Sequence, residues 1–364
     1  KVFEMTLEWL SKRLLELSRL DAYIKPTSND RVIKMDANEN LVLAPQFLND
    51  IVSKAVSMTD LRYYPGEELE RVYAQLSRYL NLNKKHIAVS NGSDQIIESL
   101  LSTLGKRANV TIVEPTFSYF INRCKLHDIP IESIPLNETD NSIPYSRFMN
   151  SAKKSNIVYI CSPNNPTGNQ FDRETMLDMV ESLHDKLIIV DEAYVEFGNY
   201  SLSQFVTKYD NLIVLRTMSK AFGLAGARIG YLISQENLAE IFRTQIQSPY
   251  PINSLSLAVA TSALSVYQYF FEIIQLIRQQ RDKMFLNLSK MQGIKPFRSD
   301  ANFVFFESFD LYDSIQEGLR QESISIKALG DFYGYSGCFR VTVGTEEMNN
   351  KFICSIRNIM SKDG

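Results

Sequence analysis

Cysteine and histidine are scarce in this sequence, and neither is clustered. Four cysteines and three histidines are scattered over 364 residues, and no two cysteines form a CxxC pair. A zinc site or a disulfide framework needs several such residues at close spacing. We therefore predict no metal site and no structural disulfide.

The sequence also lacks an excess of charge of one sign. Its 39 lysines and arginines and 42 aspartates and glutamates give a formal net charge of −3, without a long run of either sign. A surface for nucleic acid or for an anionic membrane would need a basic excess. We predict neither a nucleic-acid partner nor a membrane partner.

No apolar run has the length of a membrane span, and the opening segment does not have the pattern of a signal peptide. This segment, KVFEMTLEWLSKRLLELSRL, has helical periodicity, but charged residues interrupt it throughout. Glu4, Glu8 and Glu16 offset its cations, which argues against a membrane-surface anchor. We expect a packing helix in a cytoplasmic protein.

What the sequence does contain is a series of short runs rich in Ile and Val, separated by segments of helical period. The runs cover residues 86–89, 109–113, 130–134, 156–160, 187–190, 212–215 and 229–233. Such runs are typical of the buried strands of a mostly parallel sheet. The predicted fold class is α/β, with a large domain whose mostly parallel sheet is flanked by helices and a smaller α/β domain.

Changes in this pattern suggest how the chain is divided. Residues 1–40 are expected to form an N-terminal helix and an arm that packs with the small domain. Residues 41–270 form the expected large domain, and residues 271–364 the small C-terminal domain. A long helical stretch near 257–289 precedes further predicted strands at 302–306 and 338–343.

Clusters of polar residues follow five of the predicted strands. They cover residues 90–94, 114–117, 162–168, 191–194 and 217–220. The carboxyl ends of parallel strands meet at one edge of a sheet, where open α/β proteins bind ligands. We therefore predict a single site built from all five clusters.

Two charged residues and one segment indicate what this site could bind. Asp191 ends a hydrophobic run, so its carboxylate needs a cation, which could be Arg228, Lys220 or a ligand. Lys220 lies among small residues and must be paired, exposed or covalently engaged. The segment 90–94 fits an ordinary turn and helix cap, but at a helix start it could also bind a phosphate. With an aromatic residue such as Phe117, these features meet the needs of pyridoxal phosphate.

Four motifs, taken in order, resemble those of the class I and II aminotransferases, which are pyridoxal phosphate enzymes of fold type I. They are SPNNPTG, VDEAY, SKAFGLAGARIGY and CFRVTVGT. The resemblance extends from about Asp36 to the end of the chain. Within this superfamily the sequence is most similar to the histidinol-phosphate aminotransferases, through DANEN, SKAFGLAG, SPYPINS and GCFRVTVGT.

The resemblance implies a role for each matching residue. Catalysis would involve Lys220, which binds the cofactor aldehyde and moves a proton, Asp191, which pairs with the pyridine nitrogen, and Tyr194. The implied cofactor-binding residues are Gly92, Ser93, Asp94, Phe117, Asn165, Asp191, Tyr194, Thr217, Ser219, Lys220 and Arg228, together with Tyr64 from the neighbouring subunit of a homodimer. The implied substrate-binding residues are Tyr23, Asn165, Lys327 and Arg340, of which Arg340 grips the anionic group.

Four departures from the histidinol-phosphate pattern concern the substrate. The usual Pro-Gly after the early tyrosine is absent from residues 23–26. The segment 38–45 differs from the usual NENPYGPS, Lys327 replaces a usual arginine, and Gln95 replaces a glutamate. The favoured activity is transamination between histidinol phosphate and 2-oxoglutarate, a step of histidine biosynthesis. The alternatives are an aminotransferase for aromatic or other amino acids, a threonine-phosphate decarboxylase, and a non-catalytic protein that kept the fold.

Overall fold

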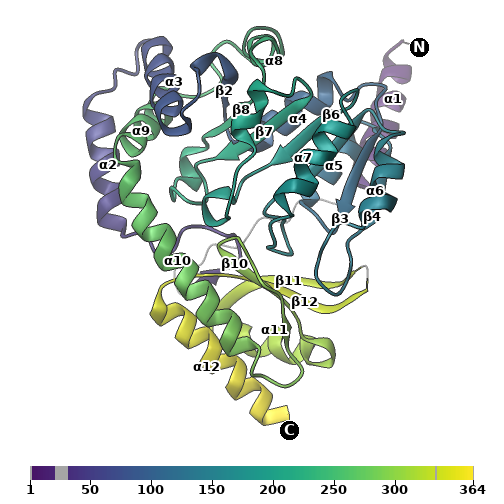
Figure 1. The fold of residues 1–364 in the computed structure, drawn as a ribbon, viewed down its shortest axis with the longest axis vertical. Coiled ribbons are helices and arrows are strands. Elements are labelled where there is room, and N and C mark those ends of the chain that lie inside the picture. The colour runs from purple at the N-terminus through teal and green to yellow at the C-terminus, as the bar shows by residue number, and fades with distance from the viewer. Residues whose placement is uncertain (1, 21–31, 333, 364) are drawn as a thin grey trace.

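Two β-sheets covered by helices organise the protein. The structure is a computed structural model that describes residues 2–20, 32–332 and 334–363 (Figure 1). The larger sheet has the strand order β2-β8-β7-β6-β5-β3-β4, and the smaller has the order β1-β11-β12-β10-β9. The two sheets form the cores of the upper and lower halves of the molecule in Figure 1.

All seven predicted runs form strands of the larger sheet, to within two residues at either end. These strands are β2 (Ile87–Ser90), β3 (Val110–Glu114), β4 (Ile131–Pro135), β5 (Ile157–Cys161), β6 (Leu187–Asp191), β7 (Leu212–Thr217) and β8 (Gly230–Ile233). Neighbouring strands from β4 to β7 pair in parallel, whereas β8 is antiparallel to both β7 and β2. The prediction of a mostly parallel sheet is confirmed.

Alternate residues of the central strands pack on opposite faces of this sheet. In β5, Val158 and Ile160 belong to one hydrophobic cluster, whereas Ile157 and Tyr159 belong to another. Successive side chains of a strand point to opposite faces, so a strand that is apolar throughout must be covered on both. Helices α4 (Ser93–Thr103), α5 (Ser118–Leu126) and α8 (Glu236–Ile241) cover one face, and α6 (Tyr145–Ala152) and α7 (Arg173–Ser182) the other.

The smaller sheet combines C-terminal strands with one strand from the arm. Its strands are β1 (Ile33–Met35), β9 (Lys295–Pro296), β10 (Phe303–Glu307), β11 (Ile324–Phe332) and β12 (Tyr335–Thr342), and helices α11 (Tyr312–Gln321) and α12 (Glu346–Asp363) accompany them. Strand β1 pairs in parallel with β11. The arm therefore becomes part of the small sheet at β1.

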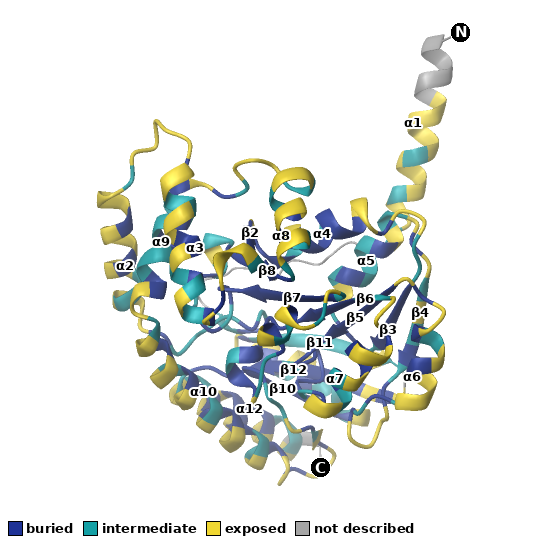
Figure 2. Ribbon diagram, turned by 45° about the horizontal axis from the view of Figure 1, so that its top comes forward, coloured by how far each residue is buried: buried dark blue, intermediate teal, exposed yellow. Residues whose placement is uncertain are grey.

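The N-terminal helix α1 (Val2–Ser18) projects away from the rest of the protein (Figure 2). None of its described side chains, from residue 8 onward, is buried, and Trp9, Leu10, Leu14 and Leu15 are exposed. It lies near the helices of the large domain in both views. Among the described part of residues 1–40, β1 and the segment 36–38 directly after it contact the small domain.

The predicted long helical stretch near 257–289 consists of two helices. α9 (Ser254–Ser265) and α10 (Tyr267–Leu288) meet at an angle of 78°, with Val266 between them. No single described helix is long and apolar enough to cross a membrane. By length and composition alone, α9 and α10 together could do so as a bent pair. α10 passes from the upper to the lower half of Figure 1, and we propose the domain boundary near residue 270 in its first turn.

The remaining helices complete the large domain and the connections. They are α2 (Pro45–Ser57) and α3 (Gly66–Leu80), the 3₁₀ segments Lys84–His86, Val195–Phe197, Ser203–Thr207, Ala225–Ala227 and Phe309–Leu311, and a π-helical turn at Phe242–Ile246. Both α2 and α3 pack against α9, next to the face of the sheet that α6 and α7 cover.

Candidate active site

A cavity of about 660 Å³ lies between the large sheet and the small domain. Its lining includes residues from all five polar clusters that follow the strands, and residues of β1, β11 and β12 from the small sheet. The volume is within the range of sites that enclose a cofactor or a drug-sized ligand. The structure thus brings the five clusters together at one place.

One wall of the cavity is the N-terminus of α4. Gly92 precedes this helix with φ of +83° and is its N-cap residue. A Cβ at Gly92 would overlap the Arg228 guanidinium, and a Cβ at Gly230 would overlap the backbone nitrogen of Ser93. Only glycine allows the guanidinium and the first amides of α4 to approach this closely. Free amides and a nearby guanidinium together favour an anion such as a phosphate.

Two hydroxyls and one carboxylate accompany these amides. Arg228 Nη2 donates to Asp94 Oδ2 at 3.0 Å, and both side chains are about 40% exposed (42% and 41%). Thr217 Oγ1 accepts a hydrogen bond from the Ser219 backbone N–H at 3.1 Å and lies 2.9 Å from Ser219 Oγ. All of these residues line the cavity.

Lys220 reaches into the cavity and makes no ion pair with any described residue. Its Nζ donates to the backbone carbonyl of Ala37 at 2.9 Å and lies 5.7 Å from the centre of the Tyr194 ring. Loss of hydration, aided by the positive charge of Arg340, lowers the pKa of Lys220 to about 8. A larger share of the amine is therefore uncharged at neutral pH than for an ordinary lysine.

Asp191 is buried, with 2% of its surface exposed, and no described cation faces it. Oδ1 accepts from the backbone N–H of Ala193 at 3.1 Å, and Oδ2 accepts from the Tyr159 hydroxyl at 2.9 Å. Burial raises the pKa of Asp191 to about 6, although both hydrogen bonds oppose this rise. The sequence suggested Arg228, Lys220 or a ligand as the cation that pairs with Asp191. Because Arg228 binds Asp94 and Lys220 binds the Ala37 carbonyl, a ligand is the remaining candidate.

Arg340 and Lys327 lie side by side at the small-domain wall. They are paired in the register of β12 and β11, and both line the cavity. Arg340 Nη1 donates to Asn165 Oδ1 at 2.5 Å, so the guanidinium is already held in place. Desolvation, followed by the charge of Arg340, lowers the pKa of Lys327. This wall has an excess of positive charge that suits an anionic ligand.

The arm segment 36–38 contacts functional side chains of both domains. These contacts are the hydrogen bonds of Arg340 Nη2 to the Asp36 carbonyl (2.7 Å), of Lys220 Nζ to the Ala37 carbonyl (2.9 Å) and of Asn38 Nδ2 to the Tyr194 hydroxyl (3.0 Å). Asn302 Nδ2 in turn donates to the Asn38 carbonyl at 3.0 Å. The resemblance included DANEN, but sequence analysis assigned no role to these three residues.

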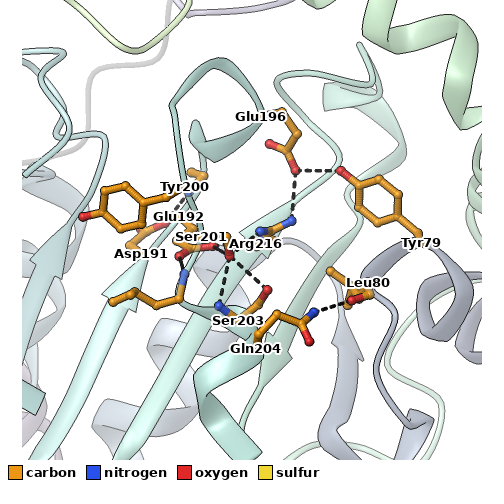
Figure 3. A network of polar contacts seen from close by, with 12 residues as sticks. Tyr79, Leu80, Asp191, Glu192, Glu196, Tyr200, Ser201, Ser203, Gln204 and Arg216 are labelled. Atoms are coloured by element: carbon orange, nitrogen blue, oxygen red, sulfur yellow. Dashed lines mark hydrogen bonds and ion pairs between the residues drawn. The ribbon is translucent and has the colours of Figure 1, made fainter. Parts of the chain in front are cut away.

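A buried ionic network, whose residues are not part of the cavity lining, lies at the ends of β6 and β7 (Figure 3). Arg216 Nε donates to Glu192 Oε2 at 3.1 Å, and Arg216 Nη1 lies 3.6 Å from Glu196 Oε1. Each of the three side chains is at most 7% exposed. Glu192 follows Asp191 and Arg216 precedes Thr217, so the network joins the two strand ends that carry these cavity residues.

Two of the described residues that were predicted for the site, Tyr64 and Gly92, are not part of the cavity lining. Tyr64 is 79% exposed and stacks on Tyr250 with ring centres 4.6 Å apart. Tyr23 lies outside the described residues. Gly92 comes directly before Ser93 and Asp94 of α4, which do line the cavity.

Sequence analysis missed Tyr159, although a buried tyrosine inside an apolar strand usually has a partner for its hydroxyl. Its partner here is Asp191. The need of a buried hydroxyl for a partner could have drawn attention to Tyr159. The sequence alone could not show that this partner is Asp191, which lies 32 positions away.

Comparisons with known proteins agree with this geometry. Residues 30–356 match the family model for aminotransferase class I and II. The chain is 33% identical over 331 residues to the histidinol-phosphate aminotransferase of Caldanaerobacter subterraneus subsp. tengcongensis. These aligned residues make up 90% of this chain and 93% of that protein.

Solved structures have the same fold. The histidinol-phosphate aminotransferase from Clostridium acetobutylicum superposes with a TM-score of 0.82 and 26% identity, over 91% of this chain and 100% of that one. The structure of the histidinol-phosphate aminotransferase from Sinorhizobium meliloti in complex with pyridoxal-5′-phosphate has a TM-score of 0.84 and 20% sequence identity. The match covers 94% of this chain and 96% of that one. These similarities confirm the predicted fold class.

Proposed function

Because the chain belongs to the class I and II aminotransferase family, whose members depend on pyridoxal phosphate, we propose that it transfers an amino group from histidinol phosphate to 2-oxoglutarate. The products would be imidazole acetol phosphate and glutamate. The observation that carries this proposal is the 33% identity to a histidinol-phosphate aminotransferase over 90% of the chain. The arrangement of the cavity residues independently supports the dependence on pyridoxal phosphate.

The cavity residues fit pyridoxal phosphate. Lys220 offers an amine with a pKa of about 8 for the aldehyde, and Asp191 offers a buried carboxylate for a protonated ring nitrogen. The residues that would hold the phosphate are Ser93 and Asp94 through their amides, and Thr217, Ser219 and Arg228 through their side chains. Phe117 would stack on the ring, and Asn165 and Tyr194 would bind its phenolic oxygen.

Lys220 is the proton carrier in this proposal. When bound, pyridoxal phosphate supplies an electron-withdrawing ring that stabilises the negative charge left when the substrate loses its Cα proton. Lys220 takes that proton as a general base, for which a pKa near the working pH is favourable. Asp191 keeps the positive charge of the ring nitrogen paired inside the protein.

Arg340 and Lys327 provide for the anionic groups of both substrates. Histidinol phosphate carries a phosphate and 2-oxoglutarate carries two carboxylates, so one cationic wall can serve both. Arg340 can bind an anion with two parallel hydrogen bonds, whereas Lys327 contributes a point charge. Asn165, which accepts from Arg340, and Tyr23 complete the proposed substrate-binding set.

We also propose that the enzyme is a cytoplasmic homodimer in which Tyr64 of one copy reaches the phosphate in the other. Tyr64 is exposed and lies next to other exposed apolar side chains, including Leu61 and Tyr63. Such a group is favourable at an interface. All four cysteines are free thiols, as suits a reducing compartment.

Steady-state kinetics with four substrates test the proposed activity. Purified protein, saturated with pyridoxal phosphate, is assayed with histidinol phosphate, phenylalanine, aspartate and threonine phosphate. We expect the largest kcat/KM for histidinol phosphate with 2-oxoglutarate as acceptor. A larger value for phenylalanine or aspartate, or release of CO₂ from threonine phosphate as the main reaction, would contradict it.

A further inference from the structure

Tyr159 of β5 is the side chain that holds the Asp191 carboxylate. It is fully buried, and its hydroxyl donates to Asp191 Oδ2 at 2.9 Å. Among the described residues, the other hydrogen bond to this carboxylate comes from a backbone group, the Ala193 N–H at 3.1 Å. Tyr159 therefore supplies the side-chain hydrogen bond to a carboxylate that no described cation neutralises.

The position of the Tyr159 hydroxyl is fixed by packing. Its ring stacks on Phe120 of α5, with ring centres 3.7 Å apart and planes 11° apart, and Phe120 is itself buried. In the pairing of β5 with β6, Cys161 lies opposite Asp191 and Tyr159 is two residues earlier on the same face. A ring held between the sheet and α5 cannot turn its hydroxyl away from Asp191 without opening the core.

The other groups around Asp191 do not favour its charged form. The titratable groups that face it are Tyr159 and Cys161 of β5, Glu192 and Tyr194 after β6, and Asp94 of α4. Asp94 and Glu192 are acidic and oppose a second negative charge nearby. The hydrogen bonds from Tyr159 and Ala193 are thus what stabilises the carboxylate before a ligand enters.

We propose that Tyr159 is a positioning residue that keeps Asp191 ionised and oriented toward the ring nitrogen of pyridoxal phosphate. A carboxylate that accepts a hydrogen bond is a weaker base, so the proton it shares with the ring stays on the nitrogen. The protonated ring is the form that withdraws electrons. This inference rests on the dependence on pyridoxal phosphate but not on which amino donor the enzyme uses.

The variant Tyr159→Phe tests this role, because it removes the hydroxyl and leaves the stacked ring. The main readout is solid-state ¹⁵N NMR of bound pyridoxal phosphate that carries ¹⁵N at the ring nitrogen. We expect the resonance to move toward the unprotonated position in the variant. We also expect kcat to fall about tenfold or more, with the KM of the amino donor changed less than about twofold.

Tyr335→Phe is the matched control. Tyr335 is also buried and donates its hydroxyl to Asn141 at 2.5 Å, but it lies in the small domain and does not line the cavity. It should leave the nitrogen resonance at the wild-type position. An equal shift in both variants would overturn the proposal, since the loss of any buried hydroxyl would then produce it.

A double variant separates positioning from a general effect on folding. If Tyr159 acts through Asp191, adding Tyr159→Phe to Asp191→Asn should lower kcat no further. A further tenfold loss would overturn the proposal, as would a wild-type nitrogen resonance in Tyr159→Phe. Wild-type protein that binds no pyridoxal phosphate would overturn the proposed function together with this inference, so the two failures are distinguishable.

Discussion

Lys220 and Asp191 carry opposite charges, and burial moves both toward neutrality. The pKa of Lys220 falls to about 8 and that of Asp191 rises to about 6, because loss of hydration penalises the charged form of each. Each group can therefore change its charge within reach of physiological pH. Catalytic residues commonly show such shifts, and here the two lie in one cavity.

The shifted pKa of Lys220 predicts how the apoprotein captures pyridoxal phosphate. Only the uncharged amine attacks an aldehyde, so the capture rate should rise with pH and level off above a midpoint near 8. Replacing Arg340 with Gln removes a neighbouring positive charge and should move this midpoint upward. Stopped-flow absorbance between about pH 6 and pH 10 measures both curves.

Arg173→Gln serves as a control for the general loss of a positive charge. Arg173 lies over the Phe205 ring and does not line the cavity, so the midpoint should stay near that of the wild type. A midpoint of the wild type near 10.5, the ordinary value for lysine, would contradict the assignment of Lys220.

At the scale of single elements, the strand ends were the most predictable part of the site. Runs such as 187–190 are apolar throughout, so they predicted buried strands, and the polar clusters then had to lie at the carboxyl edge. Strand β11 was not predicted, because most of its residues are only partly buried and it contains Gly330 and Asp331. The three-residue strand β1 is too short for any period to appear.

The start of α4 gives a second prediction, on cofactor affinity. Gly92→Ala would place a methyl group against the Arg228 guanidinium and force a positive φ on a residue with a Cβ. We expect the Kd for pyridoxal phosphate to rise about tenfold or more. Fluorescence titration of the apoprotein with the cofactor measures this change.

Gly226→Ala is the matched glycine control. It lies two residues from Arg228, has no positive φ, and an added Cβ would meet nothing within 4 Å. Its Kd should remain within about twofold of the wild type. An equal rise of the Kd in both variants would show that binding of the cofactor does not depend on the close approach of Arg228 to Gly92.

The network between β6 and β7 predicts a large effect on stability. Arg216→Met leaves Glu192 and Glu196 buried without their cation, and this should lower the free energy of unfolding by about 3–5 kcal/mol. Adding Glu192→Gln removes one of the uncompensated charges and should restore part of the loss. Chemical denaturation of the apoprotein provides the measurement.

An exposed ion pair supplies the comparison for Arg216. Arg71 and Glu67 pair on the surface of α3 at 3.0 Å, with 52% and 83% of their side chains exposed. Arg71→Met should cost less than about 1 kcal/mol. A similarly small loss for Arg216→Met would mean that its network does not hold the two strand ends together.

At the scale of the whole molecule, the sequence predicted the two-domain α/β architecture but not the long-range contacts. Asp191 was expected to need a partner, yet Tyr159 could not be distinguished from any other aromatic residue of a buried strand. The pairing of Arg216 with Glu192 and Glu196 also depends on strand order and side-chain direction. Such contacts follow from the assembled sheet, whereas the strands follow from local hydrophobic pattern.

The proposed dimer can be tested by mixing two defective variants. Tyr64→Ala should weaken the phosphate contact in the partner's site, and Lys220→Ala should abolish the site that carries it. Unfolding the two together and refolding them should give mixed dimers, in which one of the two sites has both residues intact. We expect about a quarter of all sites to recover, measured as transaminase activity above that of either parent.

Sedimentation measures the oligomeric state of the wild-type protein and of the mixture. Wild-type protein should sediment as a dimer, and the activity of the mixture should depend on refolding the two variants together. An active monomer, or no recovery in mixtures that do form dimers, would contradict the role proposed for Tyr64.

The arm segment 36–38 has a consequence for motion between the two domains. Asp36 follows directly after β1 of the small sheet, and the Ala37 carbonyl binds the amine of Lys220 from the large domain. A rotation of the small sheet carries this carbonyl with it and so changes what the amine can donate to. The hydrogen bonding of the Lys220 amine is thereby coupled to the angle between the domains.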